Sequence, residues 1–267
     1  GDPLAYLLGQ QEFYGRPFAV SPAVLIPRAD TETLVETALE QLLLLRQQRR
    51  TVDVPGAEAP ALVSPPAQTH TCQGRSSADA QALLSKTSSC PTPPPLSLLE
   101  LGTGSGIIAI TLALEAPDTE VHAVERSPEA LAVAQQNAKA LGADRIHWHP
   151  GSWWQALASP RRFDLIVSNP PYIAANDHHL QQGDLRFEPP QALAAGPDGL
   201  DDLRIIIGGA PAHLNPGGWL LLEHGYDQEA PVQTLLRDAG FADVFTRRDL
   251  AGQPRVSGGR WLGDGRK

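Results

Sequence analysis

From residue 96 onward, hydrophobic residues form short continuous runs separated by stretches with helical periodicity. Continuous apolar runs are typical of strands buried on both faces, whereas apolar positions at three- and four-residue steps indicate amphipathic helices. The runs predict strands at 96–101, 121–124, 146–148, 163–167 and 219–222, and the periodic stretches predict helices at 107–115, 128–141, 203–213 and 228–239. This alternation predicts a doubly wound α/β fold around a parallel sheet.

The C-terminal part of the chain breaks this alternation. Residues 241–246 and 255–262 read as two more strands, with only a turn at 249–254 between them. Because no helix is available for a parallel crossover, the two strands are predicted to pair as an antiparallel hairpin at an edge of the sheet. The expected fold class is therefore α/β, with a seven-stranded, mostly parallel sheet and an antiparallel C-terminal hairpin.

Residues 1–46 read as a hairpin within 11–20 followed by a helix over 30–46, whose apolar side chains recur on one face. After residue 46 the helical periodicity of apolar residues is lost. Residues 47–95 are rich in Pro, Ser and Ala, and the part from 51 onward holds eight prolines and no aromatic residue. Such a segment buries too little apolar surface to offset its ordering entropy. We expect a disordered insertion at 47–95, and an α/β domain at 96–267.

Composition and charge narrow the class of protein. The 267 residues carry a net charge of −9, which disfavours binding to nucleic acid. No apolar run approaches the roughly 20 residues of a membrane-spanning helix, and no secretory signal is visible, so we expect a cytoplasmic protein. The sequence contains no Met, which indicates a processed chain or a fragment. Both cysteines, Cys72 and Cys90, lie in the predicted insertion and cannot form a disulfide framework.

A glycine-rich segment joins the first predicted strand of the sheet to the first helix. Its members are Gly102, Thr103, Gly104, Ser105 and Gly106. Glycines allow close approach of the backbone to a ligand, and a helix N-terminus offers free N–H groups. The segment lacks the Lys-Ser/Thr of a P-loop, and Ile107 replaces the third glycine of the dinucleotide motif. Glu125, at the tip of the second strand, is placed to accept ribose hydroxyls. Together these residues favour a nucleoside-containing cofactor over a ligand-free turn.

A second motif, Asn169-Pro170-Pro171-Tyr172, follows the fourth strand. The two prolines fix the backbone path and leave carbonyl oxygens free, while Asn169 adds a further acceptor. An amide or exocyclic amine nitrogen is a poor nucleophile because its lone pair is delocalised. The Asn169 side-chain oxygen and the Pro170 carbonyl can hold its two hydrogens, and the Tyr172 ring can pack on the planar group. The alternative is a rigid proline turn without a ligand.

In this order, the glycine turn, the acidic strand tip and the NPPY motif resemble class I S-adenosylmethionine-dependent N-methyltransferases. Three further segments make the resemblance more specific: AVLIPRADTE at 23–32, QQGDLRFEP at 181–189 and LEHG at 222–225. Together they are similar to the HemK/PrmC family, the N5-glutamine methyltransferases of peptide chain release factors. The resemblance covers the chain from residue 2 to residue 262, apart from the predicted insertion.

This resemblance implies a Rossmann-like methyltransferase domain at 96–267 that uses S-adenosyl-L-methionine and acts on a release factor, as a monomer without membrane or nucleic-acid partners. It implies cofactor contacts by residues 102–106, by Glu125 at the ribose, by Trp153 near the adenine and by Asn169. It also implies that the substrate glutamine is contacted by Asn169, Pro170, Pro171 and Tyr172. Ser152 stands where the family often has an acidic residue, which leaves recognition of the adenine amine open. Family members usually begin with a small helical domain, close to whose end this chain starts.

Three alternatives remain open. The protein could methylate a glutamine of a ribosomal protein, methylate an adenine of a nucleic acid, or bind the cofactor without catalysing a reaction. The pair His178-His179 has no Cys or carboxylate at metal spacing, so we expect a solvated loop and no metal site. Arg28 and Glu32 are at the spacing of an i,i+4 pair at a helix start. Glu223 and His224 at a strand tip could lie behind the cofactor or make structural hydrogen bonds.

Overall fold

The computed structural model describes residues 2–52, 94–157 and 161–263. Two compact units are distinguished, residues 1–46 with 95–267 and residues 47–94, and the elements below are described for the first. The predicted insertion lies, except for its two ends, outside the described residues. None of the described helices is both long enough and apolar enough to cross a bilayer.

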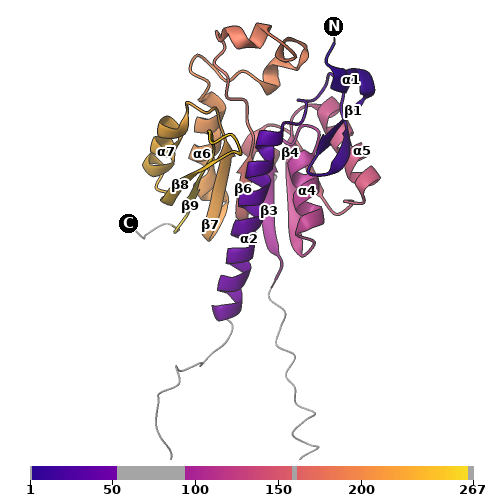
Figure 1. Cartoon of the computed structure of the whole chain (residues 1–267). Helices are drawn as coiled ribbons and strands as arrows, with labels where there is room; N and C mark the ends of the chain where they lie inside the picture. Colours follow the sequence, from indigo (N-terminus) through magenta and orange to yellow (C-terminus); the bar gives the residue numbers. More distant parts are fainter. Residues whose placement is uncertain (1, 53–93, 158–160, 264–267) are drawn as a thin grey trace, which may run out of the picture. The chain divides into compact units, whose positions relative to one another are not determined.

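Seven strands form one mixed sheet, as the sequence predicts (Figure 1). They are β3 (Leu96–Leu101), β4 (Thr119–Glu125), β5 (His147–Pro150), β6 (Phe163–Ser168), β7 (Leu214–Glu223), β8 (Ala242–Arg248) and β9 (Pro254–Arg260). The spatial order is β5-β4-β3-β6-β7-β9-β8, and β9 is antiparallel to both β7 and β8. The order reverses at β3, which lies between β4 and β6. In open α/β sheets a ligand site forms at such a switch point, at the carboxyl ends of the strands.

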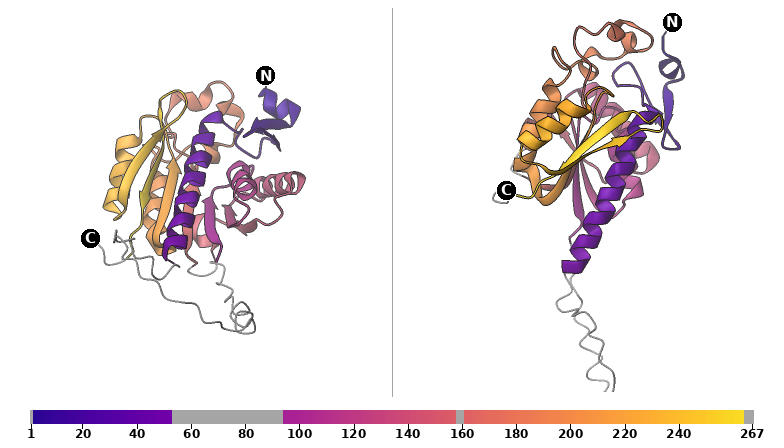
Figure 2. Two further views of the ribbon diagram at one scale, coloured as in Figure 1. Left: turned by 60° about the horizontal axis from the view of Figure 1, so that its bottom comes forward. Right: turned by 60° about the vertical axis from the view of Figure 1, so that its left-hand side comes forward.

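Helices cover both faces of the sheet, because each buries one apolar stripe against it (Figure 2). One face packs on α2 (Glu32–Val52), α4 (Ile107–Glu115) and α5 (Pro128–Leu141), through side chains such as Leu34, Leu42 and Ile110. The other face packs on α6 (Asp201–His213) and α7 (Glu229–Asp238), through Ile206 and Leu236. The four helices predicted between strands are thus present, with ends shifted by at most two residues.

The N-terminal elements contain the predicted hairpin, formed by β1 (Gln10–Phe13) and β2 (Arg16–Ala19). A short helix α1 (Leu4–Leu8) precedes it and was not predicted. Helix α2 starts directly after the 3-10 turn η1 (Ala29–Thr31) and runs to Val52, six residues past the predicted end. The predicted boundary followed the last apolar position, whereas Gln and Arg residues continue the helix because they are good helix formers. Arg49 and Arg50 lie in its last turn, where positive charge is favourable.

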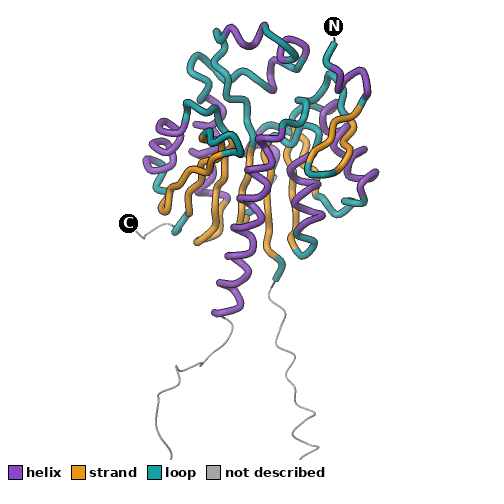
Figure 3. Tube along the Cα trace, viewed as in Figure 1, coloured by secondary structure: helices purple, strands orange, loops and turns teal. Residues whose placement is uncertain are grey.

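The connection from β6 to α6 is irregular and lies beyond the carboxyl edge of the sheet (Figure 3). It contains three 3-10 turns that the sequence did not predict, η3 (His178–Gln181), η4 (Leu185–Phe187) and η5 (Pro190–Ala192). Its two ends are held together because Ile173 and Ala194 form a parallel bridge. A further 3-10 turn, η2 (Trp153–Ala156), follows β5. These loops contribute walls of the pocket described next.

Candidate active site

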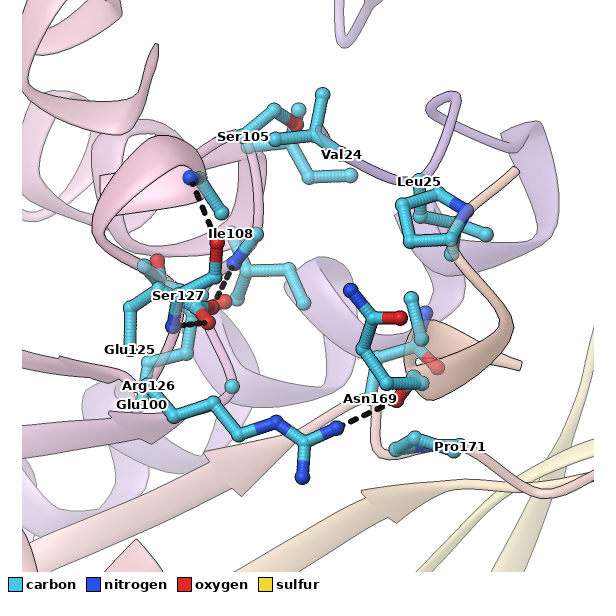
Figure 4. A pocket seen from close by; sticks show the side chains of 18 of the residues that line it. Val24, Leu25, Glu100, Ser105, Ile108, Glu125, Arg126, Ser127, Asn169 and Pro171 are labelled. Carbon is cyan, nitrogen blue, oxygen red and sulfur yellow. Dashed lines mark hydrogen bonds between the residues drawn. The ribbon is translucent and has the colours of Figure 1, made fainter. Parts of the chain in front are cut away.

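One pocket lies at the carboxyl ends of β3, β4 and β6, at the switch point of the sheet (Figure 4). Most residues singled out in the sequence line it: Gly102, Thr103, Gly104, Ser105, Glu125, Trp153, Asn169 and Pro171. Gly106, Pro170 and Tyr172 lie next to lining residues in the chain but do not line the pocket themselves. The β6–α6 connection contributes to the pocket wall through Gln191, whose carbonyl oxygen accepts from the Arg126 side chain at 3.1 Å.

The glycine turn has the backbone conformation that its composition predicts. Gly102, Gly104 and Gly106 all have positive φ, of 76°, 57° and 85°. A Cβ on Gly106 would lie 2.7 Å from Ile110 Cδ1, so this glycine is required for packing of the turn on its own helix. A Cβ on Gly104 would meet nothing within 4 Å. Gly104 therefore presents bare backbone to open space in the pocket wall.

Glu125 ends β4 and ties the turn to the next strand. Its Oε2 accepts the Gly104 N–H at 2.9 Å, and its Oε1 accepts the Ser127 N–H at 2.9 Å. Each carboxylate oxygen has a second lone pair, so both can still accept a hydrogen bond from the pocket. The carboxylate is thus held in one orientation by two backbone donors. This is the geometry needed for an acceptor of neighbouring hydroxyls.

Glu100, at the end of β3, is a pocket residue to which the sequence gave no role. It is fully buried, accepts the Thr103 hydroxyl at 2.5 Å and caps α4 by accepting the Ala109 N–H at 3.0 Å. Burial raises the pKa of this carboxyl to about 8, although both hydrogen bonds lower it. The available signal was an acidic residue in the buried strand, two residues before the glycine-rich segment.

The NPPY segment begins where Ser168 fixes the end of β6 to β3, by a 2.7 Å hydrogen bond from its hydroxyl to the Leu101 carbonyl. Asn169 lines the pocket, and its amide nitrogen Nδ2 donates to the Thr31 hydroxyl at 3.2 Å. The Tyr172 carbonyl accepts from Gln228 at 2.9 Å. Burial raises the pKa of Tyr172 above its ordinary value of 10, so its phenol stays neutral well above neutral pH. The segment is therefore anchored at both ends.

Residues 28–32 reach the pocket from outside the sheet, and each charged side chain among them holds a different element. Arg28 pairs with buried Glu188, which also accepts the Ile26 N–H at 3.0 Å. Asp30 pairs with Arg255 of β9 at 3.0 Å. The Arg28–Glu32 pair that the i,i+4 spacing allows is not the one observed, because Glu32 accepts the Tyr14 N–H of the N-terminal hairpin at 3.0 Å. Local spacing could not reveal these partners, since they lie far away in the chain.

Glu223, the last residue of β7, and His224, which follows it, match one each of the two alternatives that the sequence left open. His224 is structural, with Nδ1 at 2.7 Å from the Gly225 carbonyl and Nε2 at 2.8 Å from the Ser257 hydroxyl. Glu223 is buried next to the pocket residues, and its carboxyl interacts with the side chains of Thr31 and Asn169. Burial raises the pKa of Glu223 to about 7, opposed by these hydrogen bonds and by the charge of Arg255.

The tryptophans after β5 have different surroundings. Trp153 has a positive φ of 44° and its ring lies against Gly102, where a Cβ would come within 3.2 Å. Both Trp153 and Ser152 line the pocket. Trp154 turns away, donating to the Ile205 carbonyl at 3.0 Å and stacking on His213 with ring centroids 4.8 Å apart. Trp153 is thus the tryptophan available to a ligand, and Trp154 packs against α6.

Two groups of metal-ligand side chains lie away from the pocket. A carboxylate does accompany His178 and His179, contrary to the expectation from the sequence. Asp177 Oδ1 lies 2.7 Å from His179 Nδ1. The histidines themselves are exposed, as expected. The second group joins Glu120 and His122 of β4 to His147 of β5, at the opposite end of the sheet. There Arg161 donates to Glu120 at 2.6 Å, so a positive charge already neutralises its carboxylate.

The fold is that of a class I methyltransferase. A family model described as "Methyltransferase small domain" matches residues 76–187. The solved structure of the hMettl16 catalytic domain, in complex with the MAT2A 3′UTR hairpin 1, is similar with a TM-score of 0.52 and 19% identity. The similarity covers 64% of this chain and 65% of that one, and at this identity it concerns the fold alone.

Curated relatives define the family. A release factor glutamine methyltransferase of Xylella fastidiosa is 45% identical over 263 residues, covering 98% of this chain and 78% of that protein. Proteins of the same name from Bordetella pertussis and Vibrio cholerae are 46% and 41% identical, with 97% and 98% of this chain and 78% and 74% of theirs covered. This chain belongs to the release factor glutamine methyltransferase family.

Proposed function

We propose that this chain transfers the methyl group of S-adenosyl-L-methionine to the side-chain amide nitrogen, N5, of a glutamine in a peptide chain release factor. The observation that carries the proposal is the placement of Asn169. Its amide lies in the pocket wall with its nitrogen directed at Thr31, while the glycine turn and Glu125 form another part of the same wall. A group that binds an amide and a group that binds a nucleoside thus share one pocket.

The residues of the pocket suit the proposed cofactor. Gly104 offers backbone that no side chain covers, next to the oriented Glu125 carboxylate that would accept the ribose hydroxyls. Trp153 would pack on the adenine, beside Gly102. When bound, S-adenosylmethionine supplies an electrophilic methyl group on a sulfonium. The protein then needs to supply proximity and orientation, and these are the contributions that fixed polar groups make best.

The substrate side follows from the chemistry of an amide. Its nitrogen lone pair is delocalised, so it attacks only when the group is held in the right direction and its developing positive charge is stabilised. Asn169 Oδ1 and the Pro170 carbonyl would accept the two N–H groups, which fixes the nitrogen and increases its electron density. The Tyr172 ring would pack near the planar amide. A proton lost after transfer would leave through solvent.

A release factor is the proposed partner because the relatives carry this substrate in their names and are similar over nearly the whole of this chain. The chain's own composition agrees, since a net charge of −9 is unfavourable for a polyanionic substrate. We expect the protein to act as a monomer.

The test is methyl transfer from radiolabelled cofactor to three separate substrates: a release factor, a ribosomal protein and duplex DNA containing adenine. We expect label in the release factor alone, and mass spectrometry should assign it to one glutamine side chain. Replacing that glutamine by glutamate should abolish labelling. Label in the ribosomal protein or in DNA, with none in the release factor, would refute the proposal.

A further inference from the structure

Asn169, which the proposed chemistry requires, lies in the pocket wall next to Thr31 and Glu223, to which that chemistry assigns no role. These three side chains, which form one group, come from the residue after β6, from η1 and from the end of β7. Thr31 and Glu223 each expose about 1% of their surface. A buried polar group costs roughly 1–3 kcal/mol when it is not hydrogen-bonded, so the hydrogen bonds within the group favour one orientation of each side chain. One carboxylate oxygen of Glu223, Oε2, has no hydrogen-bond partner among the described residues.

Hydrogen-bond directions within the group follow from its composition. An ionised Glu223 carboxylate can only accept, so the single hydroxyl hydrogen of Thr31 must point towards it. The Thr31 oxygen is then free to accept from Asn169 Nδ2, which lies 3.2 Å away. Glu223 also interacts with the Asn169 amide. Both acceptors therefore attract the nitrogen end of Asn169, and the oxygen Oδ1 remains for an outside donor.

Other contacts hold the two acceptors in place. Asp30, next to Thr31, pairs with Arg255 at 3.0 Å, and the same guanidinium pairs with Asp249 at 3.1 Å. The Arg255 side chain is only 12% exposed. Arg255 also interacts electrostatically with Glu223. The positive charge thus stabilises the carboxylate form of Glu223 and fixes the segment that carries Thr31.

We infer that Thr31 and Glu223 are positioning residues that fix the Asn169 side-chain amide with Oδ1 towards the substrate, an inference that rests on the proposed function. Without them, the amide can rotate by half a turn and present an NH₂ donor to an amide nitrogen that itself carries hydrogens. Such an arrangement repels the substrate amide. The effect should fall on turnover, because Asn169 acts on the reacting nitrogen, and not on binding of the cofactor.

The first experiment compares Thr31→Val with Thr31→Ser in methyl transfer to a release factor under saturating cofactor. Val keeps the shape of Thr but removes the acceptor, so we expect kcat to fall about 10- to 100-fold. Ser restores the hydroxyl and should recover most of the activity. Thr37→Val is the matched control. Thr37 is buried like Thr31, but it lies within α2, and its hydroxyl donates to the Thr33 carbonyl at 2.7 Å. Its activity should equal wild type.

The second experiment uses Glu223→Gln. A glutamine amide can donate to the Thr31 oxygen, which lets the Thr31 hydroxyl point at Asn169 and reverses the direction of the whole group. We expect a loss of kcat at least as large as in Thr31→Val, with an unchanged cofactor dissociation constant. Protonation of Glu223 should act in the same direction. Its pKa is about 7, and Arg255, Asp30 and Tyr172 are the charged or titratable groups that face it.

Wild-type kcat should therefore fall as the pH drops below about 7, and Glu223→Gln should lack this step. Wild-type turnover by either Thr31→Val or Glu223→Gln would overturn the inference, and so would an equal loss in Thr31→Val and Thr31→Ser. Asn169→Ala in the same assay distinguishes a failure of the positioning role from a failure of the proposed function. If Asn169→Ala is inactive while Thr31→Val is fully active, only the positioning role fails. If Asn169→Ala is fully active, the proposed function of the segment fails as well.

Discussion

Apart from Trp153, the residues on the cofactor side of the pocket are close together in the chain, whereas those on the substrate side come from three distant segments. The glycine turn, Glu100 and Glu125 all lie within residues 100–125, along one strand–turn–helix–strand unit. On the substrate side, Asn169 contacts Thr31, which is 138 residues away, and Glu223 joins them from a third segment. Changes on the first side should alter cofactor binding, and changes on the second should alter turnover.

Gly104→Val should have the largest effect on the cofactor side. The residue has a φ of 57°, and a side chain there would extend into the space that faces the ligand. We expect cofactor affinity, micromolar in the wild type, to fall by about 10²-fold or more, measured by calorimetry. Gly142→Val is the control, since Gly142 has a φ of 75° and equally open space but caps α5 far from the pocket. Equal losses in both variants would mean that strain, not access, is responsible.

Glu125→Gln should lower the affinity for the cofactor by about 10- to 100-fold, because charge-assisted hydrogen bonds are worth roughly 1.5–3 kcal/mol. Both carboxylate oxygens accept backbone N–H groups, so one of these donors would face the NH₂ of glutamine. Methyl transfer at saturating cofactor should stay near wild type. Glu129→Gln, which changes an exposed carboxylate in the first turn of α5, should leave the affinity intact. Unaltered affinity in Glu125→Gln would exclude this carboxylate from the ribose site.

Glu100 predicts a pH dependence of stability. Its pKa is raised to about 8 in the folded protein from an ordinary value near 4.5, so the folded state holds the proton more tightly than the unfolded state. The stabilisation is complete below about pH 4.5 and is lost as the pH rises towards 8, by at most about 1.4 kcal/mol per pH unit. Glu100→Gln should flatten this slope in urea unfolding at pH 5 to 9. An identical slope in the variant would assign the pH dependence to other groups.

Tyr172→Phe should have the smallest effect. The phenol is neutral at the pH of the assay, since burial raises its pKa further above the ordinary value of 10, and the ring that is proposed to pack on the amide is kept. We expect kcat to fall by less than about tenfold, whereas Tyr172→Ala should lose considerably more. Steady-state kinetics with a release factor would compare the two. A Phe variant as impaired as the Ala variant would show that the hydroxyl, not the ring, is the functional group.

The difference between contacts within one segment and contacts between distant segments also explains which features the sequence could predict. The sheet, its four crossover helices, both hairpins and the glycine turn follow from periodicity and turn chemistry, which are local properties. The anchors of residues 28–32 could not be found this way, because Arg28 meets Glu188 and Asp30 meets Arg255 only once the chain is folded. The 3-10 turns between 178 and 192 have no periodic pattern to detect. Glu223 was noticed at its strand tip and Asn169 in its motif, but nothing local in the sequence places these two side chains next to Thr31.

The most direct test of the account is methyl transfer to a release-factor glutamine by Asn169→Ala at saturating cofactor, paired with calorimetric cofactor binding by the same protein. Asn215→Ala is the control, since that amide bonds to Asp164 at 2.8 Å near the start of β7. The account predicts that Asn169→Ala loses about 10²–10³ in turnover, as expected for a fixed polar contact to the reacting group, while its cofactor affinity changes little. Transfer at the wild-type rate, or a loss explained entirely by weaker cofactor binding, would contradict it.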